Sequence, residues 1–548
     1  MSSSARPARK EEPSHKDGRE VEWQLASTDL ASVRRWLDDH GTIEGLVLEP
    51  RSTLKIFDTY FDTDDWRIHR AGFALRIRSE DGKSEATLKS LRSNSTVMAD
   101  RRELSETLQS TDSESIARST GPVGMRVHAV SGAHPLQPLF EVHTSRQRYA
   151  VHTANDERPL GEIALDETVI SRPQGEPQTS LQRVEVEALT DAHEPLQTLV
   201  KALQSGCSLE AASDTKFSQG LKSVGLAPVP PAELAPTAVN AAMRIEEVGL
   251  ANLRLYMSAW DLHEPGARLG DDPEELHDLR LAGRRLDAIL RQFGAYLPAA
   301  LVQIRPTLKT VLRALGEARD LDVALLELDA FNRRLSGADQ ATLEPLKQHL
   351  RSERAGARTR MLTLLDSSTV QKDFNELRLG LAQPSDAIAA PGAPALQVVP
   401  GLIRARYKKV RKGAKRLTPE SAMESYHAVR ANVKKVRYLL ESVSGMFGKP
   451  AGGMVRSLRR WQEKLGVQQD ADVASRRLQS LAAAPPKGLP PETLFLMGRL
   501  AAHYADRASK ARKRHPRAYR KVRGRWKVLK SKLEEVTPRL PPLPSSGP

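Results

Sequence analysis

The sequence predicts an α+β multidomain protein, with an N-terminal antiparallel β tunnel barrel and flanking helices followed by an all-α domain. Short segments that alternate apolar and charged residues dominate from residue 20 to about 186, which is typical of antiparallel strands. After about residue 239 the apolar residues follow helical spacing. One helical pattern, centred on His277, recurs at His427, so we expect the all-α domain to be a tandem repeat of a helical bundle.

The composition excludes several classes of protein. Among the 548 residues Cys207 is the only cysteine, which excludes a disulfide scaffold and a cysteine-cluster zinc site and favours a reducing compartment. No apolar run approaches the roughly 20 residues that span a bilayer, so we expect no membrane insertion. Because the N-terminus is polar and lacks the apolar core of a signal peptide, the sequence predicts a cytoplasmic protein.

Positive charge is concentrated at one end of the chain. Residues 401–548 contain 35 Lys and Arg and 10 Asp and Glu, or +25. The totals of 83 and 68 then leave 48 and 58, or −10, for residues 1–400. A solubilising basic face would explain the excess, but the asymmetry favours an acidic partner such as nucleic acid, phospholipid or polyphosphate.

Proline-rich and polar stretches predict the domain boundaries. We expect, in order, a disordered tail (1–17), the barrel domain (18–224), a Pro-rich linker (225–238), the helical domain (239–535) and a second disordered tail (536–548). Within the helical domain we expect repeats at about 239–382 and 401–535, joined by a linker at 383–400.

The predicted strands place charged residues on one face and apolar residues on the other. Glu20, Glu22 and Gln24 alternate with Val21 and Trp23, and four further strands repeat the pattern. Any single strand of this kind could face water, but five together predict a closed barrel whose charged faces line the lumen. Buried charges need partners, so carboxylates from the first and last strands would hold a divalent metal and the basic residues would hold phosphates.

Two helices, at about 30–40 and 195–203, interrupt the predicted strands.

The helical repeat carries a basic stripe in each copy. His277, Arg280 and Arg284 are three and four residues apart, and their counterparts are His427, Arg430 and Lys434. Each copy is followed by the same L-G and D-x-D-V motifs, at 315–323 and 465–473. A solvated cationic face would explain one stripe, but two related stripes favour an anionic ligand.

The helical motifs resemble the CHAD (conserved histidine α-helical domain) family over about residues 239–535. The resemblance rests on H-x-x-R-x-x-x-[RK]-[RK], which occurs twice before L-G and D-x-D-V. It implies a pair of four-helix repeats that bind long-chain inorganic polyphosphate, with His277, Arg280, Arg284, His427, Arg430 and Lys434 as ligands.

The N-terminal motifs resemble the CYTH, or triphosphate tunnel metalloenzyme, family over about residues 18–224. In the order of that family, the chain has E-x-E (20–22), YFDT (60–63), FALRIR (73–78), TLK (87–89), R-R-E (101–103), R-x-R (146–148), L-D (165–166), E-x-E (185–187) and K-F-S-x-G (216–220). The resemblance implies a tunnel that binds inorganic triphosphate with Mg²⁺ or Mn²⁺ and often hydrolyses it.

The family's functional residues map onto this sequence by motif. The implied metal ligands are Glu20, Glu22, Asp166, Glu185 and Glu187. The implied phosphate-binding residues are Arg76, Arg78, Lys89, Arg146, Arg148 and Lys216. Glu20, Glu22 and Lys89 would act in catalysis, in which a metal-positioned water attacks the terminal phosphorus.

One position departs from the family pattern. Gln24 stands where E-x-E-x-K has lysine, so a positive charge is lost while a hydrogen-bond donor is kept. Loss of one stabilising group costs roughly 10²–10³ in turnover in other enzymes. Lys89, Lys216 or Arg101 could compensate.

These observations predict an inorganic triphosphatase coupled to polyphosphate binding, with polyphosphate granules as a candidate location. The first alternative is a non-catalytic polyphosphate-granule binding protein, which Gln24 favours. A nucleic-acid binder is less favoured because aromatic residues for base stacking make up only 5% of the chain. Nucleoside or thiamine triphosphate and adenylate-cyclase chemistry rank low, since the sequence contains no recognisable base-binding element. The sequence does not determine the oligomeric state, the preferred metal or the preferred chain length.

Overall fold

The computed structural model forms two compact units, Met1–Pro231 and Ala232–Pro548, which are described separately. It describes residues 15–91, 98–132, 134–191, 193–228, 238–335, 337–383, 392–486 and 488–536, without the side chains of 15–20, 98–101, 157 and 338. Among these residues, each helix is too short or too polar to span a bilayer.

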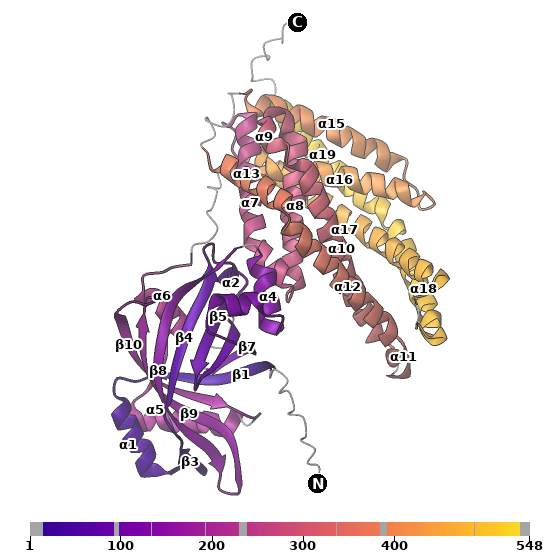
Figure 1. Ribbon diagram of the computed structural model, residues 1–548. Coiled ribbons are helices and arrows are strands. Elements are labelled where there is room, and N and C mark those ends of the chain that lie inside the picture. The colour runs from indigo at the N-terminus through magenta and orange to yellow at the C-terminus, as the bar shows by residue number, and fades with distance from the viewer. Residues whose placement is uncertain are drawn as a thin grey trace, which may run out of the picture. The chain divides into compact units, whose positions relative to one another are not determined.

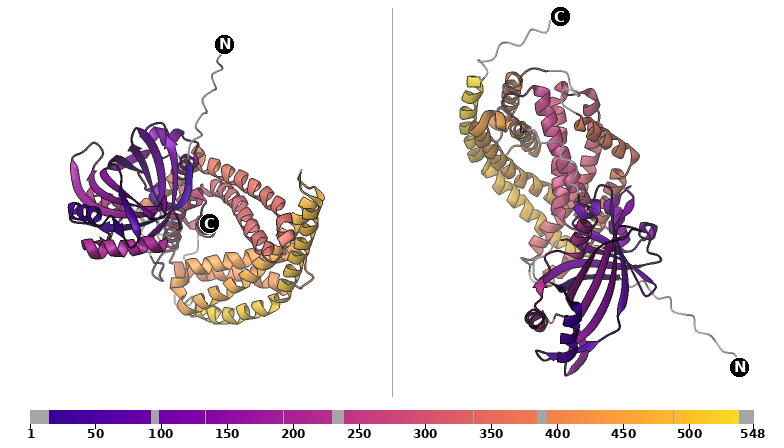
Figure 2. Two further views of the ribbon diagram at one scale, coloured as in Figure 1. Left: turned by 90° about the horizontal axis from the view of Figure 1, so that it is seen from below. Right: turned by 90° about the vertical axis from the view of Figure 1, so that its left-hand side faces the viewer.

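The first unit is a closed antiparallel barrel (Figures 1 and 2). Its wall is built from β1 (His15–Ala26), β4 (Leu54–Thr63), β5 (Phe73–Glu80), β6 (Lys83–Ser90), β7 (Met98–Leu108), β8 (Leu136–Thr153), β9 (Asp156–Ser171) and β10 (Pro177–Ala188). The strands pair in the order β8-β4-β5-β6-β7-β1-β10-β9, and β9 pairs with β8 to close the ring. The short strands β2 (Thr42–Ile43), β3 (Leu46–Pro50) and β11 (Glu210–Ala211) extend its edges. The predicted barrel is therefore confirmed.

Helices cover part of the outer, apolar face of the barrel. Helices α1 (Leu30–His40) and α5 (His193–Cys207) present Leu37 and Leu203 to Trp23 and Val184, and all four side chains are buried. Helix α6 (Lys216–Ser223) lies on the inner side instead, where Phe217 packs near Tyr60 and Phe140, and Lys216, Phe217 and Tyr60 line the lumen. The apolar sides of the strands are buried against α1 and α5, which leaves their polar sides facing the lumen.

Three details of the first unit differ from the expectations. Strand β1 begins at His15, inside the tail expected at 1–17, because its backbone pairs with β7 from His15 onward. Helix α5 is longer than the expected 195–203. Helices α2 (Arg67–Arg70), α3 (Ser113–Arg118) and α4 (Pro122–Ser131) were not predicted, since they are short and carry weak periodicity.

The second unit is all-α and internally repeated (Figure 1). The first repeat contains α7 (Ile245–Leu269), α8 (Pro273–Phe293), α9 (Ala299–Val302), α10 (Arg305–Asn332), α11 (Gly337–Thr342), α12 (Glu344–Leu365) and α13 (Ser368–Ala382). The second contains α15 (Ala395–Lys415), α16 (Met423–Ser442), α17 (Ser444–Ala483), α18 (Pro491–Lys513) and α19 (His515–Val536). The pairs α7/α15 and α8/α16 begin at the same 150-residue offset as the sequence motifs, so the predicted duplication is confirmed.

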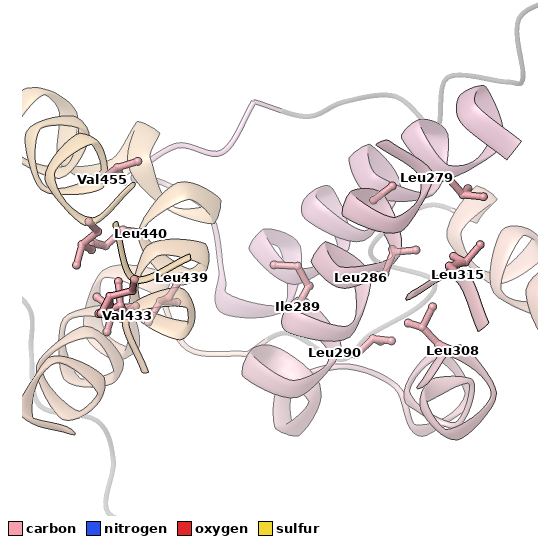
Figure 3. Close-up of a cluster of buried hydrophobic side chains, with 14 of the residues drawn as sticks. Leu279, Leu286, Ile289, Leu290, Leu308, Leu315, Val433, Leu439, Leu440 and Val455 are labelled. Carbon is pink, nitrogen blue, oxygen red and sulfur yellow. The ribbon is translucent and has the colours of Figure 1, made fainter. Parts of the chain in front are cut away.

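One apolar core runs through both repeats. The apolar residues at helical spacing on α8 and α16 are buried, among them Leu279, Leu286, Val433 and Leu440. Figure 3 shows the side chains of α8 packed beside those of α10, and the side chains of α16 near those of α17. Burying the apolar stripe of each helix leaves its basic stripe on a different face.

The linker expected at 383–400 ends earlier than predicted. Helix α15 begins at Ala395, and Pro400 lies within the helix rather than before it. The Pro-, Ala- and Gly-rich composition of this stretch predicts a linker, but Pro400 is buried within α15, and tertiary packing outweighs its unfavourable helix propensity.

Replacing Leu203 by alanine should destabilise the barrel unit. Leu203 on α5 is fully buried, so Leu203→Ala removes core contacts and should lower the free energy of unfolding by about 2–5 kcal/mol. Leu189→Ala is the matched control, because Leu189 in the same unit is 50% exposed and should change stability by no more than about 0.5 kcal/mol. The urea dependence of hydrogen exchange in barrel peptides of the full chain measures both. Equal losses would show that α5 does not cover the barrel as described.

Candidate functional site

A charged cavity of about 200 Å³ lies inside the barrel. Six glutamates and five basic residues contribute to its lining: Glu22, Glu85, Glu103, Glu162, Glu185, Glu187, Arg76, Arg78, Lys89, Arg146 and Lys216. Gln24, Tyr60 and Phe217 are among the other lining residues. So many ionisable groups in one enclosed space must neutralise one another or a bound ion.

Strand alternation explains why these side chains converge. Glu22 and Gln24 line the cavity, while Trp23 between them is buried on the outer face. Across the β1–β10 pair, Glu22 lies opposite Glu187 and Gln24 lies opposite Glu185. The charges predicted on the first and last strands are therefore neighbours.

The most buried charges form a network around Arg146. Its guanidinium donates two hydrogen bonds of 2.7 Å to Asp166 and a third of 2.6 Å to Glu185. Lys216 contacts Asp166 and lies 3.1 Å from Glu185. Burial alone would raise the pKa of Glu185, but Lys216 and Arg146 outweigh it and hold that pKa well below its ordinary value. Glu185 is therefore ionised.

A second network joins Gln24 to Glu22 and Lys89, the two catalytic candidates whose side chains the structure describes. Lys89 donates to Glu22 at 3.0 Å, and the amide nitrogen of Gln24 donates to the same carboxylate oxygen at 3.0 Å. The amide oxygen of Gln24 accepts a 3.0 Å hydrogen bond from Arg183. Arg183 is buried and also donates to the carbonyl of Asp214 at 2.6 Å. Gln24 thus connects the positive charge of Arg183 to the carboxylate of Glu22.

A third network lies on β4 and β5. Arg78 binds Asp58 through two hydrogen bonds of 2.8 and 3.0 Å, and Arg76 lies 3.9 Å from Asp58 and 3.8 Å from Glu103. Burial would raise the pKa of Asp58, but Arg78 and Arg76 outweigh it and lower that pKa. Asp58 therefore orients two of the predicted phosphate-binding arginines.

The structure places most, but not all, of the sequence-predicted residues at the cavity. Glu22, Glu185, Glu187, Arg76, Arg78, Lys89, Arg146 and Lys216 line it. The backbone of Glu20 in β1 pairs with that of Arg101 in β7, and the side chains of both lie outside the described residues. Arg148 is not among the lining residues and lies 3.5 Å from Glu162.

Asp166 occupies a different place from the one expected for a metal ligand. Its side chain is fully buried and outside the cavity lining, and both oxygens are bound by Arg146. The family resemblance implied a metal ligand here, but the Asp166 side chain contacts Arg146 and Lys216. In this arrangement Asp166 positions Arg146 instead of facing a ligand.

Three lining or supporting acids were missed by sequence reasoning. Glu162 shares the inward face of β9 with Asp166, so strand alternation could have identified it. Glu103 ends the R-R-E motif and lines the cavity. Asp58 could not have been found, because its pairing with Arg78 depends on the register of two strands.

The cavity residues offer the type of ligand that a divalent metal ion prefers. Carboxylate oxygens are the ligands that Mg²⁺ and Mn²⁺ prefer, and several glutamates face one space. Oε2 of Glu103 is buried and accepts no hydrogen bond among the described residues. Burial, aided by Asp166 and Glu80, raises the pKa of Glu162 despite Arg148 and Arg146. A bound cation would relieve this crowding of acidic groups.

The helical unit carries a second candidate site, at which the two repeats meet. Arg280 on α8 and Arg430 on α16 are both partly buried, and both lie close enough to Arg284 for repulsion from its charge to oppose their own ionisation. Burial is the first cause of the lowered pKa of each arginine, and this repulsion adds to it. The basic stripes therefore converge.

The shared motifs of the repeats have a structural explanation. Gly316 and Gly466 are the glycines of the two L-G motifs, and a Cβ on either would lie 3.5 Å from the guanidinium of Arg280 or Arg430. The first aspartates of the D-x-D-V motifs, Asp320 and Asp470, interact electrostatically with those arginines, and burial raises the pKa of both acids.

The second aspartate of each motif forms an ion pair with a neighbouring helix. Asp322 of α10 binds Arg354 of α12, and Asp472 of α17 binds Arg512 of α18 at 3.0 Å. The two acids of the motif thus have separate roles, one at the basic centre and one in helix packing. Sequence reasoning found the motif but did not assign these roles.

The two motif histidines differ in their surroundings. His277 is exposed, whereas His427 is partly buried and its Nε2 has no hydrogen-bond partner among the described residues. Lys434 and Arg284 are partly buried on the same stripes. All six predicted ligands lie on α8 or α16, the helices that bring the repeats together.

The stability of the barrel unit should fall at acidic pH. The lowered pKa values of Asp58 and Glu185 make a contribution that is fully present above their ordinary values of 3.8 and 4.5 and is lost as pH falls below them. Urea-dependent hydrogen exchange of barrel peptides between pH 6 and pH 3 measures this loss. Asp58→Asn should lower stability at pH 6 and flatten the pH dependence. An unchanged slope in that variant would rule out the assigned Asp58–arginine pairing.

Comparison with known proteins identifies both units. The CYTH domain model matches residues 38–218, and the CHAD domain model matches residues 251–479. No curated protein matches the chain. Among solved structures, the chain is similar to the CHAD domain from the plant Ricinus communis, with 25% identity over 56% of this chain and 96% of that one and a TM-score of 0.43.

Two further structures are similar to parts of the chain. PptA from Streptomyces chartreusis is 20% identical over 51% of this chain and 100% of that one, with a TM-score of 0.40. The putative adenylyl cyclase HpAC1 from Hippeastrum, described as having a dominant triphosphatase activity, is 18% identical over 38% of this chain and 97% of that one, with a TM-score of 0.29. With one family model on each unit, the chain carries a CYTH domain followed by a CHAD domain.

Proposed function

We propose that the barrel hydrolyses inorganic triphosphate in a metal-dependent reaction and that the helical unit binds long-chain inorganic polyphosphate. The observation that carries the proposal is the enclosed cavity in which glutamates from β1 and β10 face a set of arginines and lysines. A metal–phosphate ion complements both halves of this lining. Carboxylates suit the metal, and cations suit the phosphate oxygens.

The roles of the lining residues follow from their contacts. Glu22, Glu185 and Glu187 would hold Mg²⁺ or Mn²⁺ together with Glu20, and Glu103 is close enough to the same cavity to assist. When bound, this ion would neutralise phosphate oxygens and lower the pKa of a coordinated water. Arg76, Arg78, Lys89, Arg146 and Lys216 would bind the phosphate chain, with Asp58 and Asp166 fixing the arginines.

Hydrolysis needs one water and one broken phosphoanhydride bond. The water oxygen attacks the terminal phosphorus, its proton passes to a carboxylate such as Glu22 or Glu20, and pyrophosphate leaves. Lys89, which contacts Glu22, is placed to stabilise charge on the phosphoryl oxygens.

A non-catalytic polyphosphate-binding tunnel is the second candidate, and Gln24 favours it. A neutral amide stands where the family has lysine, and it binds Glu22 while accepting from Arg183. If Arg183 acts through Gln24 as the missing charge, catalysis is retained. If the hydrogen bond from the Gln24 amide only makes Glu22 unavailable for catalysis, the tunnel binds polyphosphate without hydrolysing it.

In the helical unit, the convergent stripes support a polyanion site. Arg284 repels both Arg280 and Arg430. A chain of phosphates would relieve this repulsion and gain affinity by releasing counterions, as in nucleic-acid binding. His277, His427 and Lys434 would extend the same site.

Phosphate release from tripolyphosphate separates the two candidates for the tunnel. With Mg²⁺ or Mn²⁺, the wild type should release phosphate, and Glu22→Gln or Glu185→Gln should reduce turnover by about 10²-fold or more. Glu167→Gln is the matched control, because Glu167 is exposed on β9 next to Asp166 and should leave turnover unchanged. Wild-type release no greater than that of Glu22→Gln would leave the non-catalytic tunnel.

Charge reversal at the two repeat arginines tests the helical site. Arg280→Glu with Arg430→Glu should weaken binding of polyphosphate of about 100 units by at least tenfold, since two cations become repulsive. Tripolyphosphate binding by the barrel should be nearly unchanged. Reversal of two exposed cations off the stripes, Arg333→Glu with Lys372→Glu, controls for net charge. Equal loss of both ligands in the stripe variant would refute the division of labour.

A further inference from the structure

The two repeats share a fold but not a surface charge. Helices α15 and α19 of the second repeat contain 15 basic and 2 acidic residues, or +13. Their counterparts α7 and α13 in the first repeat contain 4 basic and 6 acidic residues, or −2. Because the repeats have the same architecture, this excess is not required by folding.

The two cationic helices lie side by side. Tyr407 of α15 stacks on Trp526 of α19 with ring centres 3.8 Å apart, and both helices contribute to the shared core. Burial raises the pKa of Tyr407 and Tyr519, whereas Arg411 of α15 and Arg523 of α19 both oppose the rise. The two arginines therefore flank the same aromatic contact, so the charges of the helices form one surface, the α15/α19 face.

Most cations of this face are exposed. Ion pairs join Lys530 to Glu534 and Lys532 to Glu535, both near the end of α19. Within the part of the chain that the structure describes, the exposed cations without an ion pair or a hydrogen bond include Lys408, Lys409, Arg411, Lys412, Arg520, Lys521, Arg523 and Lys527. Like charges at this density repel one another unless an anion is bound.

A cluster of four cations joins the α15/α19 face to the helices of the central site. Lys435 of α16 lies near Arg291 of α8 and near Arg406 and Lys409 of α15; burial and these three charges lower its pKa. The Nε of Arg406 is buried and has no hydrogen-bond partner among the described residues. Lys435 directly follows the stripe residue Lys434. Positive charge is thus continuous from α8 and α16 to α15.

The chemistry of the face favours a flexible polyanion without bases or an apolar layer. Tyr407 and Tyr519 are buried and Trp526 packs against the core, so the face offers no free ring for base stacking. On the described parts of these helices, Val528 is the one exposed large apolar residue, which is too little for insertion into a membrane. Lysines and arginines on a polar surface match a linear chain with one charge in each unit.

We propose that the α15/α19 face is a second polyphosphate-binding surface, found in the second repeat only, which engages chains long enough to extend beyond the central site. This inference rests on the proposed polyphosphate binding by the helical unit. Its consequence is that affinity depends on chain length, because a short chain fills the central site alone.

The test compares chain lengths in the full-length protein. The face variant combines Lys408→Gln, Arg411→Gln, Arg520→Gln and Arg523→Gln, all at exposed positions where glutamine preserves the helix. Its affinity for polyphosphate of about 100 units should fall at least tenfold, with a shallower dependence on salt, while affinity for about 10 units should change less than twofold. A charge-matched control, Arg333→Gln, Lys372→Gln, Arg460→Gln and Lys464→Gln, should retain the length dependence.

Each outcome has a distinct meaning. If the wild type binds neither chain, the proposed function of the helical unit fails. If the wild type binds both and the face variant keeps the full preference for long chains, the α15/α19 face is not the second surface. A larger loss of affinity for duplex DNA than for long polyphosphate would also overturn the inference, because the face would then be a nucleic-acid surface.

Discussion

Charge compensation inside a closed barrel is the constraint on which the first unit depends. The outer side of the wall is needed for the apolar core, so the inward positions are the ones open to charged residues. There the acids and bases lie close to balance, and buried members such as Asp166 and Asp58 are bound by arginines. A ligand that carried only negative or only positive charge would upset this balance. A bound metal–phosphate pair replaces ion pairs within the protein by ion pairs between protein and ligand, so the balance of charge is preserved.

The helical unit meets the opposite condition. Its basic centre retains Asp320 and Asp470, but the surrounding cations outnumber them, and the α15/α19 face has almost no acids. Exposure makes this surplus tolerable, because water and counterions screen the repulsion. The same screening makes binding to such a surface sensitive to salt, whereas the enclosed tunnel is shielded from it. Under the proposed function, the two units would therefore hold phosphate by different physical means.

The fold and the inward or outward direction of the strand residues could be predicted from the sequence, but the contacts between strands could not. Alternation at Glu22, Gln24 and Trp23 is a local property and predicted which side chains point inward. The link from Arg183 through Gln24 to Glu22 depends on β10 lying beside β1, and the depth of Asp166 depends on what fills the barrel at its level. The start of α15 was placed too late because the composition of residues 383–400 indicates a linker, whereas Pro400 is buried within the helix. Register, depth and tertiary packing are collective properties, and a single sequence pattern does not encode them.

Joining a small enclosed site to an open cationic surface has a consequence for long substrates under the proposed function. A cavity of about 200 Å³ can receive only the end of a phosphate chain, and the ends of long chains are dilute relative to their internal units. A surface that holds the interior of the chain raises the local concentration of its ends, because both units belong to one polypeptide. Meeting of a chain end with the tunnel then becomes an intramolecular event with a raised effective concentration. Binding of the chain by the helical unit would in this way increase turnover in the tunnel, because it compensates for the low concentration of chain ends.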